Sequence, residues 1–173
     1  MNEQQLKETI RTIPDFPSEG ILFRDITTLV KNPEAYGSLI TTLADALRPL
    51  DVDIVIGPEA RGFVIGSAVA YALNAGFVLA RKPGKLPCKV NKIEYGLEYG
   101  HDCLEIHKDA IQPGQRVAIV DDLLATGGTA RAAVELVREM GATVVAAAFA
   151  IELSDLDGRE KLGDCPVFAA IKY

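Results

Sequence analysis

The stretch from Val117 to Ala130 constrains the fold and chemistry of this chain more than any other segment. It begins with four apolar residues at 117–120, continues with the neighbouring acids Asp121 and Asp122, and ends in a turn of small residues. The apolar run predicts a buried strand that presents two carboxylates at its carboxyl end. The turn predicts the start of a helix, whose free backbone N–H groups and positive dipole end favour a bound anion.

The residue types in this turn suit phosphate, and the acids before it suit a sugar. Gly127 and Gly128 let the backbone approach an anion closely, while Thr126 and Thr129 add hydroxyl donors. Two adjacent carboxylates favour a polyhydroxylated neighbour such as ribose. An ordinary strand–turn–helix with an acidic cap explains neither the paired acids nor the order of the turn residues. The segment therefore predicts a ligand that combines ribose with phosphate.

Strands alternate with helices along the rest of the chain. An amphipathic opening helix is expected with Leu6, Ile10 and Ile13 on one face, followed by a loop over 14–20. The further apolar segments predict helices from Asn32 to Pro49 and over 61–74 and 130–141, and strands at 52–57, 77–80, 144–151 and 167–172. This order predicts an α/β fold with a doubly wound, mainly parallel sheet flanked by helices.

Residues 92–107 have a different pattern, with apolar residues at every second position on both sides of a turn near 100–102. The alternation predicts a small antiparallel ribbon outside the main sheet. We interpret the segment at about 86–107 as a hood or lid within a single domain that spans 1–173. His101 and His107 are expected on the surface of this ribbon.

Four segments that each follow a predicted strand contribute candidate site residues from different parts of the chain. Because ligands of such folds bind beyond the carboxyl ends of the strands, we expect the four segments to meet at one crevice. They are Glu59-Ala60-Arg61, Arg81-Lys82, Asp121-Asp122 and Glu152-Leu153. The second one opens a run of five basic residues and no acidic one between Arg81 and Lys92. This run gives the crevice a locally basic wall for an anionic substrate, against the alternative of a solvated loop.

Composition excludes several classes of protein. The net charge of −6 argues against broad nucleic-acid binding, which needs a basic face. The three cysteines are widely spaced, so neither a disulfide framework nor a zinc site is expected. No signal peptide is visible at the polar amino terminus, and the longest apolar run, 144–151, is far shorter than the ~20 residues that span a bilayer. We expect a cytoplasmic protein with no membrane and no nucleic-acid partner.

The segment 117–130 resembles the phosphoribosyl pyrophosphate (PRPP) signature of the type I phosphoribosyltransferases. Over nearly its whole length the chain also resembles the adenine-specific members of that family. The motifs that carry this resemblance, in chain order, lie at 23–26, 60–63, 81–87, 97–100, 117–130, and 152–153 with 158–162. The resemblance implies a type I phosphoribosyltransferase fold and the transfer of ribose 5-phosphate from PRPP to N9 of adenine. The products would be AMP and pyrophosphate, formed with Mg²⁺ in purine salvage.

The resemblance also assigns roles within the signature. Asp121 and Asp122 would hold the 2′- and 3′-hydroxyls of the ribose. The following turn would wrap the 5′-phosphate; it consists of Ala125, Thr126, Gly127, Gly128 and Thr129. No direct metal ligand is implied, because Mg²⁺ would arrive with PRPP and reach Asp121 or Asp122 through water.

A second set of residues would bind pyrophosphate. The resemblance implies that Glu59, Ala60 and Arg61 form a loop, often with a cis peptide between its first two residues, that grips pyrophosphate partly through backbone N–H groups. The basic residues expected to help hold it are Arg81, Lys82 and Lys85. The spacing from Gly57 to Gly62 mimics an ATP-binding P-loop, but Phe63 stands where that motif requires lysine.

The resemblance also implies residues that bind adenine and residues that transfer the proton. Phe23 and Leu153 would sandwich adenine, with main-chain groups of Leu22 and Arg24 reading its polar edge. The commoner alternative is that both apolar side chains are core residues. Glu98 would be the acid–base catalyst beside Tyr99, with Arg61 stabilising the leaving group. From the residues alone, a solvated turn is an equally good reading of Glu98.

Three functions remain open on the sequence, and the leading one is the adenine enzyme. The second is transfer to another purine, namely hypoxanthine, guanine or xanthine, on the same fold. The third is a non-catalytic PRPP-sensing regulator, which the acidic balance and the lack of a DNA-binding segment before residue 14 disfavour. The resemblance also implies a homodimer in which Arg81 reaches the neighbouring site.

Overall fold

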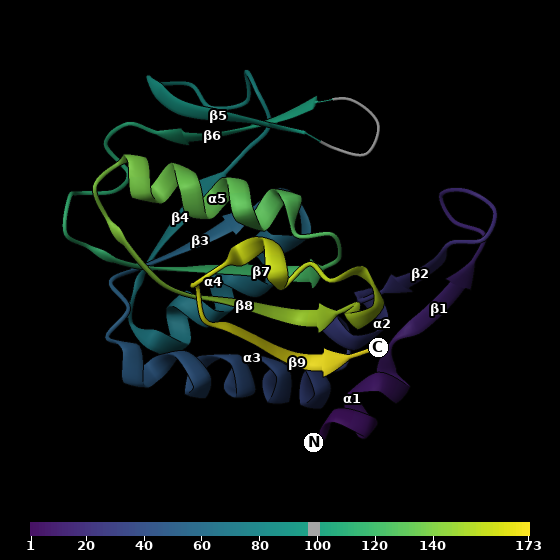
Figure 1. The fold of residues 1–173 in the computed structure, drawn as a ribbon. Coiled ribbons are helices and arrows are strands. Elements are labelled where there is room, and N and C mark those ends of the chain that lie inside the picture. Colours follow the sequence, from purple (N-terminus) through teal and green to yellow (C-terminus); the bar gives the residue numbers. More distant parts are fainter. Residues whose placement is uncertain (97–100) are drawn as a thin grey trace.

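The computed structural model describes residues 1–96 and 101–173, except for the side chain of residue 101. Its centre is a parallel sheet of five strands in the order β4-β3-β7-β8-β9 (Figure 1). In chain order these strands are β3 (Ile54–Pro58), β4 (Gly76–Ala80), β7 (Arg116–Leu124), β8 (Thr143–Glu152) and β9 (Val167–Lys172). The expected doubly wound, mainly parallel sheet is therefore confirmed.

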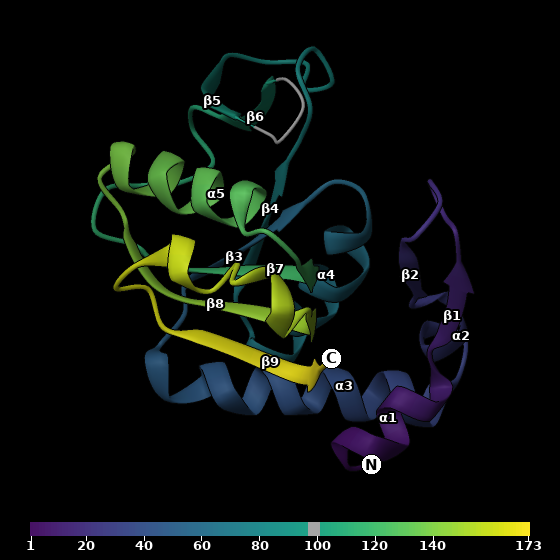
Figure 2. The same cartoon turned by 45° about the vertical axis from the view of Figure 1, so that its right-hand side comes forward.

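Helices cover both faces of this sheet. On one face α3 (Pro33–Leu47) and α4 (Arg61–Leu73) bury Leu39, Leu43 and Ile65 against the strands. On the other face α5 (Gly128–Glu139) does the same with a second apolar cluster (Figure 2). The Asn32 side chain accepts hydrogen bonds from the first turn of α3, as the Asn-Pro pair predicts.

The opening helix is shorter than the sequence pattern suggests. The helix α1 (Glu3–Thr9) ends before Ile10, and Ile13 lies in β1 (Arg11–Pro14). This strand pairs antiparallel with β2 (Leu22–Asp25), forming a two-stranded sheet that the sequence analysis did not predict. An ion pair of 2.5 Å between Arg11 and Asp25 joins the strands. Hydrogen bonds from Arg11 and Thr27 lower the pKa of Asp25 to about 2.

Short helical segments occupy several connections. They are α2 (Thr27–Val30) and the 3₁₀ turns η1 (Arg48–Leu50), η2 (Ser154–Leu156) and η3 (Glu160–Leu162). The last two follow the end of β8 and lead into β9. Within the described part of the chain, no helix is long and apolar enough to cross a membrane. The thiols of Cys88, Cys103 and Cys165 are free.

The predicted antiparallel ribbon is present and consists of β5 (Val90–Gly96) and β6 (His101–His107). It lies over α5, on the opposite side of that helix from the main sheet (Figures 1 and 2). The register pairs Gly96 with His101 and Tyr95 with Asp102, so His101 and Asp102 belong to β6 and not to the turn expected at 100–102. Residues 97–100 lie outside the described residues. His107 is half-buried, not a surface residue, because it faces Phe77 and Leu79 of β4 in a hollow that all three line, and its Nε2 is buried there.

Candidate active site

A cavity of about 240 Å³ lies where β3 and β7 end. It is lined by two chain segments that are 60 residues apart in the sequence but adjacent in the sheet. They are Glu59-Ala60-Arg61 and the run from Asp121 to Ala130. The predicted pyrophosphate loop and the predicted ribose-phosphate segment therefore face the same space. The crevice at the carboxyl ends of the strands is the place that the α/β topology favours.

The two acids of the signature, Asp121 and Asp122, lie near the carboxyl end of β7 and have different surroundings. Asp122 is buried, and its backbone N–H donates to the Asp121 carboxylate at 2.8 Å. Burial and the neighbouring charge of Asp122 raise the pKa of Asp121 well above its ordinary value. A Cβ added to Gly62 would lie 2.7 Å from Asp121 Oδ1, so the start of α4 can approach this carboxyl only with glycine at that position.

Arg61 connects the two walls of the cavity. Its Nε donates to the buried carboxylate of Asp122. Partial burial lowers the pKa of Arg61, but the hydrogen bond that Arg61 donates to Asp122 and the charge of Asp122 outweigh it and raise the pKa overall. The guanidinium also lies 5.5 Å from the centre of the Phe23 ring, within the range of a cation–π contact. Arg61 thus stays fully charged between the acids and β2.

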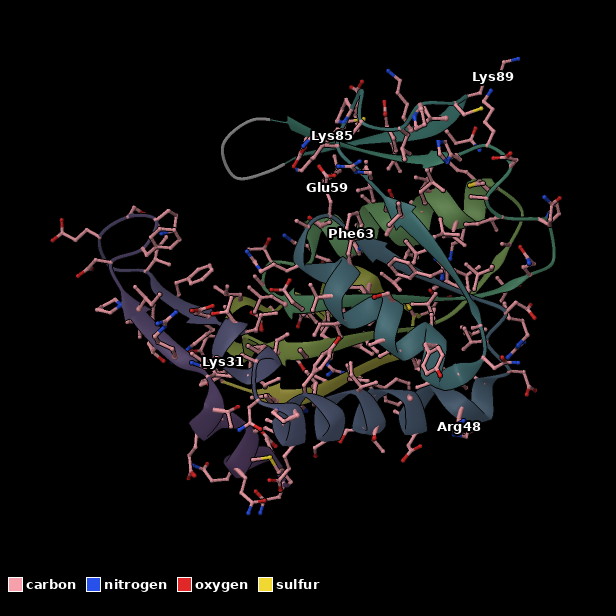
Figure 3. All side chains as sticks on the ribbon, turned by 180° about the vertical axis from the view of Figure 1, so that it is seen from behind. Lys31, Arg48, Glu59, Phe63, Lys85 and Lys89 are labelled. Carbon is pink, nitrogen blue, oxygen red and sulfur yellow. The ribbon has the colours of Figure 1, made fainter. Side chains whose placement is uncertain are left out.

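The Glu59 carboxylate forms ion pairs with two basic residues that follow β4, Arg81 and Lys85. Arg81 Nε donates to Glu59 at 2.6 Å, and Lys85 Nζ lies 3.5 Å from the other carboxylate oxygen. Burial raises the pKa of Glu59, but hydrogen bonds from Arg81 and Lys82 and the charge of Lys85 hold it below its ordinary value. Figure 3 shows Glu59 and Lys85 side by side above α4, with Lys89 at the far end of the ribbon. The peptide bond between Glu59 and Ala60 is cis, as the resemblance implies.

Lys82 contacts a residue that the sequence analysis missed. Its ammonium pairs with the Asp102 carboxylate of β6. The hydroxyl of Tyr95 lies 3.2 Å from the same carboxylate and 3.2 Å from the Thr129 hydroxyl. The ribbon is therefore joined by side chains both to the basic loop and to the phosphate-binding candidates. The alternation of β5 indicated that Tyr95 lies on one face of the ribbon, but not which element it contacts.

The turn between β7 and α5 has the form expected of an anion site. We call residues 125–129 the phosphate turn. Gly127 has φ +79°, a left-handed conformation that favours glycine, and stands just before α5. No side chain in the described residues caps this end of the helix, so the first backbone N–H groups of α5 remain available to a ligand.

The four residues predicted at the base do not line this cavity, although contacts link them to it. On β2, Leu22 is 54% exposed, and the Phe23 ring packs 5.0 Å from the Phe16 ring. The Arg24 guanidinium lies 3.9 Å from the centre of the Tyr173 ring. Leu153 donates its backbone N–H to the carbonyl of Leu124, the residue that precedes the phosphate turn. Glu98 and Tyr99 lie outside the described residues.

The residues present fit a magnesium ion that is bound together with a phosphate-bearing substrate. Among the residues that the structure describes, no group of three or more His, Cys, Asp or Glu side chains could hold a metal by itself. Asp121 and Asp122 supply hard carboxylate oxygens at the cavity, which is the ligand type that Mg²⁺ prefers alongside waters and substrate phosphates. A dedicated protein metal cage is thus not required.

Comparisons with known proteins agree with this geometry. The phosphoribosyl transferase domain family matches residues 26–167. An adenine phosphoribosyltransferase of Acidobacterium capsulatum is 54% identical over 100% of this chain and 96% of its own length. A crystal structure of the Thermoanaerobacter pseudethanolicus enzyme of that name has a TM-score of 0.97 at 50% identity and covers 99% of this chain and 100% of its own.

A further solved structure bears on the ligand. The adenine phosphoribosyltransferase of Saccharomyces cerevisiae, in complex with adenine and an imino-altritol bisphosphate, has a TM-score of 0.91 at 45% identity. The alignment covers 97% of each chain. Together with the match to the domain family over most of the chain, these similarities identify the family. The chain belongs to the phosphoribosyltransferases, and within that family of enzymes to the adenine phosphoribosyltransferases.

Proposed function

We propose that this chain transfers ribose 5-phosphate from PRPP to N9 of adenine, releasing AMP and pyrophosphate, in purine salvage. The observation that carries the proposal is the cavity that brings Asp121, Asp122 and the phosphate turn against Arg61. A ribose between a phosphate and a pyrophosphate needs this combination of carboxylates, free backbone N–H groups and fixed positive charge. Transfer to another purine remains the second candidate, but the compared relatives carry the adenine name.

The reaction breaks the bond between the anomeric carbon and pyrophosphate and forms a bond to the base. Negative charge develops on the leaving group, and positive charge develops on the sugar. Arg61 is charged at any physiological pH and lines the cavity, so it would stabilise the departing pyrophosphate. Lys82 and Lys85 would add to this basic wall, and Arg81 would do so either here or, in a shared site, in the partner subunit. Bound Mg²⁺ would supply further charge neutralisation on the pyrophosphate.

Two further groups of residues would hold the ribose 5-phosphate and the adenine base. Asp121 and Asp122 would accept hydrogen bonds from the ribose hydroxyls, and the phosphate turn would bind the 5′-phosphate. Phe23 and Leu153 would contact the faces of adenine, while main-chain groups of Leu22 and Arg24 would read its edge. Support for the base contacts comes from the motif at 23–26 and from the cation–π contact that joins Phe23 to Arg61. Glu98 and Tyr99 would act on the base, on the strength of the motif at 97–100.

Activity requires adenine, PRPP and magnesium together. Incubation with all three is expected to give AMP and pyrophosphate in equal amounts, because each transfer releases one of each. Removal of the metal with EDTA should abolish AMP formation, since the pyrophosphate charge would no longer be neutralised. Chromatographic quantification of AMP measures both, and added Mg²⁺ in excess of EDTA controls for damage to the protein. Absence of AMP in the complete reaction would contradict the proposal.

We also propose a homodimer. Val64 and Tyr71 lie seven residues apart on α4, hence on one face of that helix, and are 40% and 89% exposed. Leu79 on the edge strand β4 is another exposed large apolar side chain, at 41%. These residues support an interface on this side of the molecule. A cytoplasmic location stays a prediction.

A shared site would make Arg81 act on the partner's pyrophosphate. Mixing an Arg81→Ala chain with an Asp122→Asn chain should then restore part of the activity, since one site of each mixed dimer keeps both functional residues. The measurement is AMP formation by the mixture, compared with each variant alone at the same total concentration. A fully active protein that sediments as a monomer would exclude the shared site.

A further inference from the structure

The turn between η2 and η3, which contains Gly158, packs its backbone directly against the backbone of the phosphate turn. A Cβ added to Gly158 would lie 2.0 Å from the carbonyl oxygen of Ala125 and 3.0 Å from the backbone nitrogen of Gly127. In the other direction, a Cβ added to Gly127 would lie 2.4 Å from the carbonyl oxygen of Gly158. Real Cβ contacts are not that short, so both positions must be glycine for the two backbones to meet as they do.

An ion pair between half-exposed Arg159 and the buried carboxylate of Glu152 fixes the segment that contains Gly158. The Arg159 guanidinium donates to both carboxylate oxygens of Glu152, at 2.9 and 2.6 Å, and to the carbonyl of Val167 at 2.7 Å. Glu152 is the last residue of β8 and pairs with Leu124, which directly precedes the phosphate turn. The hydrogen bonds from Arg159 lower the pKa of Glu152, so the carboxylate stays charged. The segment is therefore attached to the same strand ends that carry the phosphate turn.

We propose that Gly158 is a positioning residue for the reaction. Because it has no side chain, its backbone packs against the phosphate turn and fixes the position of that turn's backbone. The proposal rests on the proposed binding of the 5′-phosphate by this turn. A phosphate held by backbone N–H groups needs those groups at fixed places, and a shift of tenths of an ångström in the turn weakens several hydrogen bonds at once. Gly158 would thus determine affinity for the 5′-phosphate without touching the ligand.

Gly158→Ala tests this role cleanly. Gly158 is not among the residues with positive φ, so alanine adds a contact without backbone strain. The added Cβ would push the phosphate turn away from its position. A matched control is Gly37→Ala in α3, where an added Cβ meets open space.

Calorimetric titration with AMP, which carries the 5′-phosphate, and with magnesium pyrophosphate, which does not, separates positioning from general damage. Gly158→Ala is expected to weaken AMP binding about tenfold or more, since small misplacements of binding groups carry large penalties. The KM for PRPP should rise in parallel. Pyrophosphate affinity and the KM for adenine should stay within about twofold of the wild-type values, as they should for all ligands in Gly37→Ala. Wild-type AMP affinity, or equal losses for AMP and pyrophosphate, would overturn the proposal.

Two further sets of variants separate failure of the positioning role from failure of the proposed phosphate site. If Gly158→Ala does not fold, Arg159→Lys decides, because it retains Gly158 and the charge but loses the two-pronged contact with Glu152. It is expected to give a smaller loss with the same selectivity for AMP, and an unselective loss would overturn the role. Thr126→Ala and Thr129→Ala test the phosphate turn itself. If they leave AMP affinity unchanged, the proposed phosphate site is wrong; if they weaken it while Gly158→Ala does not, only the positioning role is wrong.

Discussion

Glu98→Gln should lower kcat for AMP formation by about 10²–10⁴-fold, which is the usual contribution of a positioned general acid or base. The amide has the shape of the carboxylic acid but cannot take up or release the proton on adenine N7 or N9. PRPP affinity should change little, because the group would act on the base and not on the phosphates. The assignment comes from the motif at 97–100, which lies outside the described residues.

The neighbouring ribbon residue Glu94 offers a matched control. Its carboxylate is solvent-exposed, lies 3.7 Å from the Lys92 ammonium and does not line the cavity. Glu94→Gln makes the same chemical change in the same ribbon and should leave kcat near the wild-type value. Steady-state kinetics with adenine and PRPP varied separately give the required numbers. A Glu98→Gln enzyme with near-wild-type kcat, or one that loses PRPP affinity in step with its rate, would show that the role is wrong.

Asp122→Asn should weaken the use of PRPP severely while the fold persists. The substitution retains the shape of the side chain but removes the charge that would accept a hydrogen bond from a ribose hydroxyl and that now holds Arg61. Loss of a charge-assisted hydrogen bond costs about 1.5–3 kcal/mol, or roughly a tenfold to hundredfold loss in affinity. PRPP titration and the KM for PRPP measure the effect, with thermal unfolding as a check on the fold.

A surface aspartate provides the comparison for this variant. Asp164 pairs with Arg138 at 2.8 Å, and its side chain is 83% exposed at a point remote from the cavity lining. Asp164→Asn should therefore leave PRPP affinity unchanged. Normal PRPP affinity together with normal transfer kinetics in Asp122→Asn would show that Asp122 does not bind the ribose.

The main sheet was predictable because its strands are short apolar runs with clear ends. The run at 144–151 is buried on both faces of β8, and such a run is typical of an internal parallel strand. Asn32 and Pro33 mark the start of α3 through a side-chain cap and a fixed backbone angle, both local properties. Local signals of this kind do not depend on what the element later contacts.

The β1–β2 sheet could not be predicted from local patterns. Ile10 and Ile13 are three residues apart, which fits a helix, but pairing with a strand eleven residues further on holds Ile13 in extended conformation opposite Phe23. The ion pair between Arg11 and Asp25 that stabilises this pairing joins distant positions. Tertiary contacts thus override the local spacing, and the helix stops at Thr9.

Within the candidate site, the residue types were predictable but their partners were not. Acids after a strand and glycines before a helix indicated the sugar and phosphate chemistry, and the resemblance added the basic residues. The sequence contains no signal that Lys82 pairs with Asp102, or that Gly158 contacts the phosphate turn through backbone alone. Such contacts depend on how two loops pack in space.

The central claim is that the enzyme forms AMP from adenine in preference to the other purines. The most direct measurement is PRPP-dependent consumption of adenine, hypoxanthine, guanine and xanthine, run side by side with Mg²⁺ at equal base concentrations. We predict stoichiometric AMP and pyrophosphate from adenine and little or no nucleotide from the other three bases. Equal or faster turnover of hypoxanthine, guanine or xanthine, or no PRPP-dependent turnover of any base, would contradict the account.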